Sequence, residues 1–419
     1  MGVGIQAQEP KHRRQGQEER EADGAADSSA LAALYLYGDV LESVVDRVPA
    51  ADLAATAGVS REWLRAVRSA LRRRPRRLPW LVVHLHGRSR RRTAAYDPHS
   101  GAWLTVHAPR HATPSHVRLV RGARGDRVCA LSLSGLDVAG DPLGTSACVA
   151  MRAPRVWRVD PVLAAVGDRV VALGGACQLA LAEGEDAAAV EVHEGGSWTA
   201  CDPMPAALRE SAAATWLSAA ATDQRVYLAD RTTGWASWFD PSKRRWGPTR
   251  RLGQDAGVSS WGVAPGRAGA ERLVLFGAKR QGEGAESRVV IQAWEVDGDD
   301  LDLSTHDDTM PSEMSARLFP RDEDEEDEEE LAPSIGVCGN ATGGYVYNAA
   351  ELCNGAVLYE LRSGEKGSAV ERWEWVPCAP AVRAEPMGRA ILACSPVGLD
   401  ELARGLRPVS SRRACTDKH

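Results

Sequence analysis

The chain has 419 residues, 44% of them hydrophobic, and a formal net charge of −6. This length exceeds the usual size of one compact core, so two domains or one large repeat architecture is expected. The small net charge excludes a protein that is acidic or basic throughout. Two local blocks depart from that balance: twelve arginines crowd Arg61 to Arg92, and nine acidic residues run from Asp322 to Glu330.

The cysteines argue for a reducing compartment. Nine are present and none forms a CxxC pair, which speaks against a disulfide framework and against a zinc site of that spacing. Reduced thiols are typical of the cytosol and the nucleus. No stretch reaches the roughly 18 apolar residues of a membrane span. We therefore expect a protein of the cytoplasm, the nucleus or both, with no membrane partner.

The N-terminal part divides into a leader and a helical segment. Residues 1–30 are polar and without periodicity, which predicts a disordered leader. From 34 to 77 the apolar spacing is helical. A first helix with Asp39 as its N-cap precedes a second over 50–57 and a third that begins after Ser60. Helices this short bury little surface alone, so they need a partner or a neighbouring domain.

From Trp80 onward the periodicity changes to two, with turn residues about every ten positions, which predicts strands. A turn-plus-strand unit, written Gly-Asp-Arg-Val in its first two copies and varied in the later ones, recurs along this region. Such repeats indicate an array of similar modules. The unit is found at 125–131, 167–173, 223–228, 270–275 and 343–347.

An aromatic signature accompanies the repeat. Tyr96 is followed by Asp-Pro and, seven residues on, by Trp103; Phe239 is followed in the same way by Trp246. This spacing predicts a strand, a tight Asp-Pro turn and a returning strand whose tryptophan packs between sheets.

These features resemble kelch repeats, whose glycine pair is kept here as Gly174-Gly175. The resemblance implies a mainly β fold: a six-bladed kelch-type β-propeller over 80–395, preceded by a small three-helix segment. An acidic disordered insertion is expected at about 312–333 and a C-terminal tail at 396–419. The run 387–393 is expected to complete the first blade and close the ring. The blades are expected at 80–109, 115–160, 161–205, 210–250, 257–311 and 334–380.

Residues 34–77 resemble the F-box, an adaptor-binding segment. The usual Leu-Pro opening is Leu36-Tyr37 here, a departure from the family pattern. An F-box ahead of kelch repeats is typical of plant proteins. The positions that match, and that the resemblance assigns to binding of the Skp adaptor, are Leu36, Val40, Leu41, Val44, Val45, Val48, Pro49, Leu53, Val59 and Trp63.

The combined resemblance implies a substrate-recognition subunit of an SCF-type (Skp–cullin–F-box) ubiquitin ligase. Its partners would be the Skp adaptor, through it a cullin, and a protein substrate held by propeller loops that no motif identifies. The substrate is then ubiquitylated for proteasomal degradation. Plant relatives of this layout point to enzymes of phenylpropanoid and flavonoid metabolism as a substrate class. No catalytic residue, cofactor or metal is expected. The alternatives are a kelch scaffold without a ligase role and, third, a propeller enzyme.

Three local features leave alternatives open. The cluster Arg72–Arg77 fits a solvated helix end that complements the helix dipole, or a nuclear-import signal. Nucleic-acid binding is a third alternative, but the cluster has no interleaved aromatic residues. His84 and His86 share a strand face but no further ligand completes a metal site. The acidic run 322–330 fits a solvated insertion or a docking segment for a basic partner. We expect neither a nucleic-acid partner nor a metal.

Overall fold

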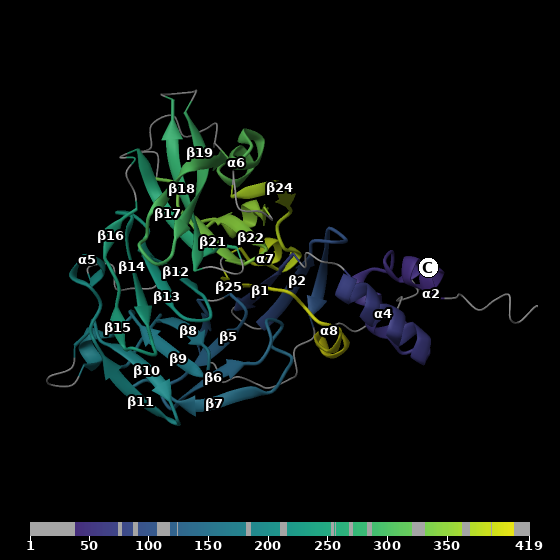
Figure 1. Cartoon of the computed structure of the whole chain (residues 1–419), viewed down its shortest axis with the longest axis horizontal. Coiled ribbons are helices and arrows are strands. Elements are labelled where there is room, and N and C mark those ends of the chain that lie inside the picture. Colours follow the sequence, from purple (N-terminus) through teal and green to yellow (C-terminus); the bar gives the residue numbers. More distant parts are fainter. Residues whose placement is uncertain are drawn as a thin grey trace, which may run out of the picture. The chain divides into compact units, whose positions relative to one another are not determined.

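The computed structural model describes residues 38–73, 78–86, 91–106, 118–123, 125–181, 186–209, 216–252, 255, 257–267, 271–282, 287–320, 332–362, 369–386 and 388–405. The chain divides into two units, Met1–Arg74 and Pro75–His419. The described residues of the first unit form helices, and those of the second form mostly strands (Figure 1). Within the described ranges, no helix combines the length and apolar composition needed to cross a bilayer.

The first unit contains three helices, at the positions that the sequence predicts. They are α2 (Gly38–Val45), α3 (Ala50–Ala57) and α4 (Arg61–Arg73). The Ser60 hydroxyl accepts hydrogen bonds from the main-chain N–H groups of Glu62 and Trp63, so Ser60 is the expected N-cap. The expectation for Asp39 is wrong, because Asp39 lies inside the first turn of α2 and not ahead of it.

The second unit is a six-bladed β-propeller, as the sequence predicts. Its six antiparallel sheets follow one another around a common centre (Figure 1). From the innermost strand outward, blade 1 has β25 (Arg389–Ser395), β1 (Trp80–His86), β2 (Arg91–Asp97) and β3 (Ala102–Val106). Blade 2 has β4 (Arg118–Arg121), β5 (Val128–Leu131), β6 (Gly135–Ala139) and β7 (Cys148–Arg152). Blade 3 has β8 (Val162–Val166), β9 (Arg169–Leu173), β10 (Val190–Glu194) and β11 (Ser197–Cys201).

The remaining three blades have the same order of strands. Blade 4 has β12 (Leu217–Ala221), β13 (Val226–Asp230), β14 (Trp235–Asp240) and β15 (Arg245–Trp246), and β16 (Arg250–Arg251) also pairs with β14. Blade 5 has β17 (Val258–Pro265), β18 (Arg272–Gln281), β19 (Arg288–Asp297) and β20 (Leu303–Thr309). Blade 6 has β21 (Ile335–Asn340), β22 (Gly343–Asn348), β23 (Ala356–Leu361) and β24 (Val370–Val376).

The ring closes by pairing the last strand with the first. β25 runs antiparallel to β1, with Val82 opposite Ala393 and His84 opposite Ile391. The expected closure by the run 387–393 is therefore confirmed over its described residues. Such closure leaves no exposed inner edge at which the array could pair with another chain.

The apolar core lies between neighbouring blades. Buried clusters fill the spaces between blades 2 and 3, 3 and 4, 4 and 5, 5 and 6, and 6 and 1. These strands alternate side chains toward each neighbouring sheet, so both faces of a blade are buried and the strands read as nearly continuous apolar runs.

The aromatic signature has the predicted structure. Tyr96 lies opposite Trp103 with ring centroids 5.4 Å apart, and Phe239 lies opposite Trp246 at 5.2 Å. In the turn after Phe239, the Asp240 carboxylate accepts main-chain hydrogen bonds from two following residues.

Short helices lie in segments outside the blade strands. The expected disordered insertion at 312–333 is wrong at its start, because Ser312–Leu318 form helix α6. Leu318 is fully buried in the cluster between blades 5 and 6, which explains why this stretch folds. The segment set apart as a tail begins with α8 (Leu399–Gly405), in which Leu402 is buried.

The connections between strands contain further short elements. They are the helices α5 (Ala206–Arg209) and α7 (Pro380–Ala384) and the 3₁₀ turns η1 (Gln178–Ala180) and η3 (Leu352–Asn354). The leader 1–30, the acidic run 322–330 and residues 406–419 lie outside the described residues.

Candidate docking surfaces

The helical unit buries part of the predicted adaptor-binding set. Leu41, Val45 and Leu53 are buried, and α2 and α3 each pack on α4. A side chain that is buried in the unit stabilises it and offers no contact area to a partner. These three positions therefore lie in the core, whereas a docking face must be built from their exposed neighbours.

Two of the predicted residues are prominently exposed. Val40 on α2 is 55% exposed and Val59, in the turn between α3 and α4, is 66% exposed. Pro49, which precedes α3, is also exposed. Isolated exposed valines are common, but these belong to the positions at which the F-box pattern expects apolar contacts.

The other predicted positions are intermediate or not described. Val44, Val48 and Trp63 are half-buried, so each presents part of its side chain to solvent. Leu36 lies outside the described residues. The assignment of the ten positions to adaptor binding stays a prediction.

The turn that exposes Val59 is set by local chemistry. α3 begins after Pro49, whose fixed φ of −55° suits a helix start, and ends at Gly58, whose N–H donates to the main-chain oxygen of Ala55. Ser60 then starts α4. Val59 therefore lies between two helix ends, where no packed turn covers it.

α4 has a row of arginines on one side. Arg61, Arg65, Arg68 and Arg72 are all exposed and recur at helical spacing. Arg73 forms an ion pair with Glu42 on α2. Of the cluster 72–77, only Arg72 and Arg73 are described. Both lie in the last turn of α4, where positive charge is favourable.

The small cavity at the inner strands has one titratable side chain among the described residues that line it. It is lined mostly by glycine, alanine, valine and proline, and the titratable side chain is Cys338. No group of three or more His, Cys, Asp or Glu side chains that could hold a metal was found in the described ranges. Converging polar side chains, which a channel enzyme requires, are thus not found in this lining.

His84 has a structural environment. It is buried, its Nε2–H donates to the main-chain oxygen of Pro142 at 2.9 Å, and its Nδ1 lies 3.1 Å from the Thr93 hydroxyl. Burial lowers the pKa of His84 from 6.5 to about 4. Burial in the propeller keeps the imidazole neutral, and both of its nitrogens lie within hydrogen-bond distance of a partner.

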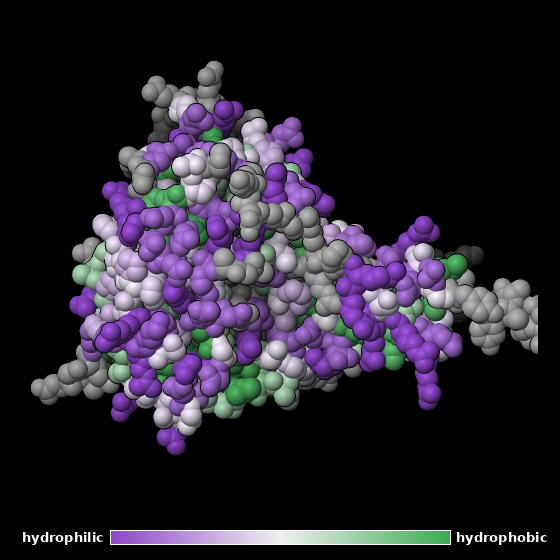
Figure 2. Space-filling model, in the orientation of Figure 1, coloured by the Kyte–Doolittle hydropathy of each residue, from purple (hydrophilic) through white to green (hydrophobic). Residues whose placement is uncertain are grey.

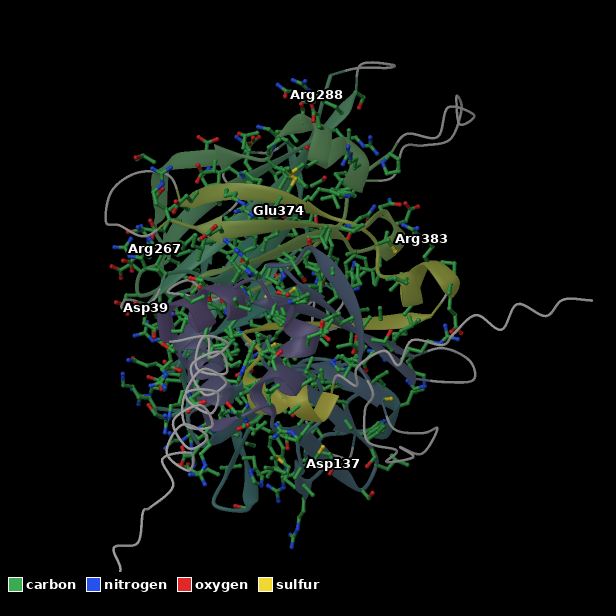
Figure 3. All side chains as sticks on the ribbon, turned by 90° about the vertical axis from the view of Figure 1, so that its right-hand side faces the viewer. Asp39, Asp137, Arg267, Arg288, Glu374 and Arg383 are labelled. Carbon is green, nitrogen blue, oxygen red and sulfur yellow. The ribbon has the colours of Figure 1, made fainter. Side chains whose placement is uncertain are left out.

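The loops of the propeller make two opposite faces. Each blade is an antiparallel meander, so the connections between its second and third strands emerge on the same side as the connections between blades. We call this side the entry face, because the chain enters each innermost strand from it. The β18–β19 hairpin, with ten residues in each strand, has Arg288 at its outer end on this side (Figure 3).

Most of the surface visible in Figure 2 is hydrophilic, with apolar residues gathered in separate small patches. Charged side chains such as Arg267, Arg383 and Asp137 lie at the periphery (Figure 3). The exposed apolar residues of the loops are therefore the candidates for a protein-binding surface. The sequence gives no signal for these residues, because their loops have no repeated motif.

Taken together, a closed six-bladed propeller and a separate small helical unit define the architecture of a kelch-type propeller protein with an N-terminal helical segment. A scan of family models found no match. The chain is 31% identical to an F-box/kelch-repeat protein of Arabidopsis thaliana over 386 residues, which cover 88% of this chain and 92% of that protein. The chain belongs to the F-box/kelch-repeat family.

Among solved structures, a chain of the nidogen/laminin complex is similar over 67% of this chain and 89% of its own length, at 11% identity and a TM-score of 0.34. Membership of the F-box/kelch-repeat family supports a role in substrate recognition, and the family name suggests a non-catalytic adaptor.

Proposed function

We propose that this chain is the substrate-recognition subunit of an SCF-type ubiquitin ligase. The helical unit binds the Skp adaptor, which connects it to a cullin, and the propeller binds the target protein. Other subunits transfer ubiquitin; this chain raises the effective concentration of the target near them. The proposal rests chiefly on the match to the Arabidopsis protein, which extends over more residues than the propeller contains.

The contact chemistry expected of the helical unit is burial of apolar side chains in a groove of the adaptor. Val40 and Val59 are the apolar side chains most available for it, since both are more than half exposed. Pro49 and the half-buried Trp63 extend the apolar surface. Leu41, Val45 and Leu53 contribute indirectly, by holding the helices together.

Co-purification tests the proposal. The wild-type chain, expressed in plant cells with an affinity tag, is expected to retain the Skp adaptor and a cullin. The double variant Val40→Asp/Val59→Asp is expected to lose both, because a carboxylate in an apolar contact costs several kcal/mol. Ser43→Asp places the same charge on an exposed position of α2 outside the predicted set and serves as the control. Wild-type chain that retains no adaptor would instead favour a scaffold role.

The target is expected among enzymes of phenylpropanoid and flavonoid metabolism, and the chain is expected in the cytoplasm, the nucleus or both. Target half-life after synthesis is blocked is the relevant measurement. Over-expression of the wild-type chain should shorten the half-life of such an enzyme, whereas the Val40→Asp/Val59→Asp variant should lengthen it by occupying the target without delivering it. Equal half-lives under both would contradict this class of substrate.

A further inference from the structure

Exposed large apolar side chains of the second unit gather on the entry face. Six such side chains are exposed among its described residues, and Val149, on the outer strand β7, is the one that lies outside the entry-face connections. The other five lie in those connections or at their borders: Leu133 (76% exposed), Val159 (36%), Leu179 (100%), Trp216 (55%) and Trp235 (36%).

Strand order places these five on one side of the molecule. Leu133, Leu179 and Trp235 lie at connections between the second and third strands of blades 2, 3 and 4, while Val159 and Trp216 lie between consecutive blades. In an antiparallel meander both kinds of connection emerge at the same end. A contact agrees with this: Arg389 and Asp160, which lie at the starts of two innermost strands, form an ion pair of 2.7 Å.

The five side chains form an arc across three consecutive blades. The loops that carry them are tied to one another: Val159 N–H donates to the oxygen of Gly175 at 2.8 Å, in the segment that leads to Leu179. The oxygen of Trp216 accepts a hydrogen bond of 2.9 Å from Arg231, which precedes Trp235 in the same loop. Because packed sheets lie about 10 Å apart, an arc over three blades spans about 20 Å.

Exposed arginines lie beside this apolar arc. Arg152 and Arg155 precede Val159 in the connection from blade 2 to blade 3. Arg251 lies directly opposite Trp235 in blade 4. Within the described part of the chain, none of these three arginines forms an ion pair with a carboxylate. They therefore favour carboxylates in a partner that extends along the arc.

We propose that the arc Leu133–Val159–Leu179–Trp216–Trp235 is the target-binding surface of the propeller. Its partner is an extended segment of the target protein with apolar or aromatic side chains at alternate positions and with acidic residues beside them. At about 3.3 Å per residue, a segment that spans 20 Å has six or seven residues. This inference rests on the proposed function, since it names the substrate feature that the receptor reads.

The size and composition of the arc fit an interaction surface. Its five side chains expose on the order of 500 Å² of mostly apolar area, as large as the largest patches on ordinary monomers. Exposed tryptophans are also the side chains that most often dominate the energy of an interface. Separate loops supply the five residues, so an extended segment that runs along the arc can place its alternate side chains against them.

A peptide selection tests the arc without knowledge of the target. Random twelve-residue peptides displayed on phage are selected on the purified full chain, and an enriched sequence is synthesised with a fluorescein label. We expect a core of six or seven residues with alternate apolar or aromatic positions and with Asp or Glu within or beside it. Leu179→Asp and Trp216→Ala should each weaken the binding of that peptide at least tenfold. Val149→Asp, at a 61% exposed valine of the outer strand β7, should leave it unchanged.

The contrary outcomes are distinct. Peptides whose affinity is unaffected by both arc substitutions, or a library without any enriched sequence, would overturn the proposal. A dimer of the wild-type chain that Leu179→Asp dissociates would also overturn it, because the arc would then bind a second copy. Retention of the adaptor separates this inference from the proposed function. The Leu179→Asp variant should no longer bind the peptide but should still bind the adaptor. A wild-type chain that binds the peptide through the arc but binds no adaptor would refute only the ligase role.

Discussion

The indole N–H of Trp103 donates a hydrogen bond of 2.8 Å to the main-chain oxygen of Pro377, which directly follows the outer strand of blade 6. Trp103 lies on the outer strand of blade 1, so this bond joins the first blade to the last. The relationship recurs around the ring: Trp198 donates to Arg152 and Trp246 to Asp202, in each case at the end of the preceding blade's outer strand. The spaced tryptophan of the repeat thus fixes neighbouring blades to each other.

Trp103→Phe is expected to lower the free energy of unfolding by about 1 kcal/mol, because the hydrogen bond to Pro377 is lost while the ring stays against Tyr96. Trp216→Phe is the matched control, since Trp216 is more than half exposed and should change stability little. Urea unfolding monitored by circular dichroism measures both. Equal effects at the two positions would show that the inter-blade bond contributes nothing.

The repeat explains how much of the fold was predictable from the sequence. The Tyr96/Trp103 and Phe239/Trp246 spacings place aromatic pairs opposite each other across a tight turn, and local physics fixes that register. The closing strand β25 was predictable because the first blade otherwise lacks its innermost strand. Ser60 fixed the start of α4 through its hydroxyl, which also needs no tertiary information.

Tertiary packing accounts for what the sequence did not reveal. α6 folds because Leu318 packs in the cluster between blades 5 and 6. The sequence next to it is an acidic run, which by itself predicts disorder. Val45 and Leu53 match the adaptor-binding pattern as well as Val40 does, and only the packing on α4 separates core from surface. The exposed loop residues follow no repeat, so their common face becomes visible only once strand order is known.

A buried ion pair in blade 3 gives the largest expected effect on stability. Arg158 and Glu191 lie 3.1 Å apart with both side chains essentially inaccessible to solvent, and Arg158 also donates to the main-chain oxygens of Gly174 and Ala189. Glu191→Gln leaves the guanidinium buried without its counter-charge, which should cost about 3–5 kcal/mol.

The control for that prediction lies on the same strand. Glu194 pairs with Arg169, but both side chains are partly exposed, so Glu194→Gln should cost less than about 1 kcal/mol. Chemical denaturation of both variants gives the comparison. A loss at Glu191 no greater than that at Glu194 would mean that water or rearranged side chains compensate the buried guanidinium.

The glycine pair of the kelch signature makes a separate prediction. Gly175 has a φ of +61°, and a Cβ there would come within 2.5 Å of the main-chain oxygen of Asp160. Gly167 has a φ of +60° with open space around it. Gly167→Ala should therefore cost about 1 kcal/mol for backbone strain alone, and Gly175→Ala should cost about 1–3 kcal/mol more for the displaced backbone. Thermal unfolding of the two variants would disprove a steric role for the pair if their midpoints coincided.

His84 predicts how stability depends on pH. Its pKa is lowered by burial to about 4 in the folded chain, against 6.5 when exposed, so the unfolded chain binds a proton that the folded chain excludes. Stability from this group is fully present above pH 6.5, falls as the pH drops toward 4, and is constant below that, with a total loss of about 3 kcal/mol. His84→Gln removes the titrating group while it keeps a side-chain N–H for the oxygen of Pro142. Unfolding free energies measured between pH 7 and pH 4 should therefore fall less steeply for this variant than for the wild-type chain, whatever its stability at neutral pH. Parallel pH profiles for the two chains would mean that other groups account for the whole acid sensitivity and that His84 titrates alike in the folded and unfolded states.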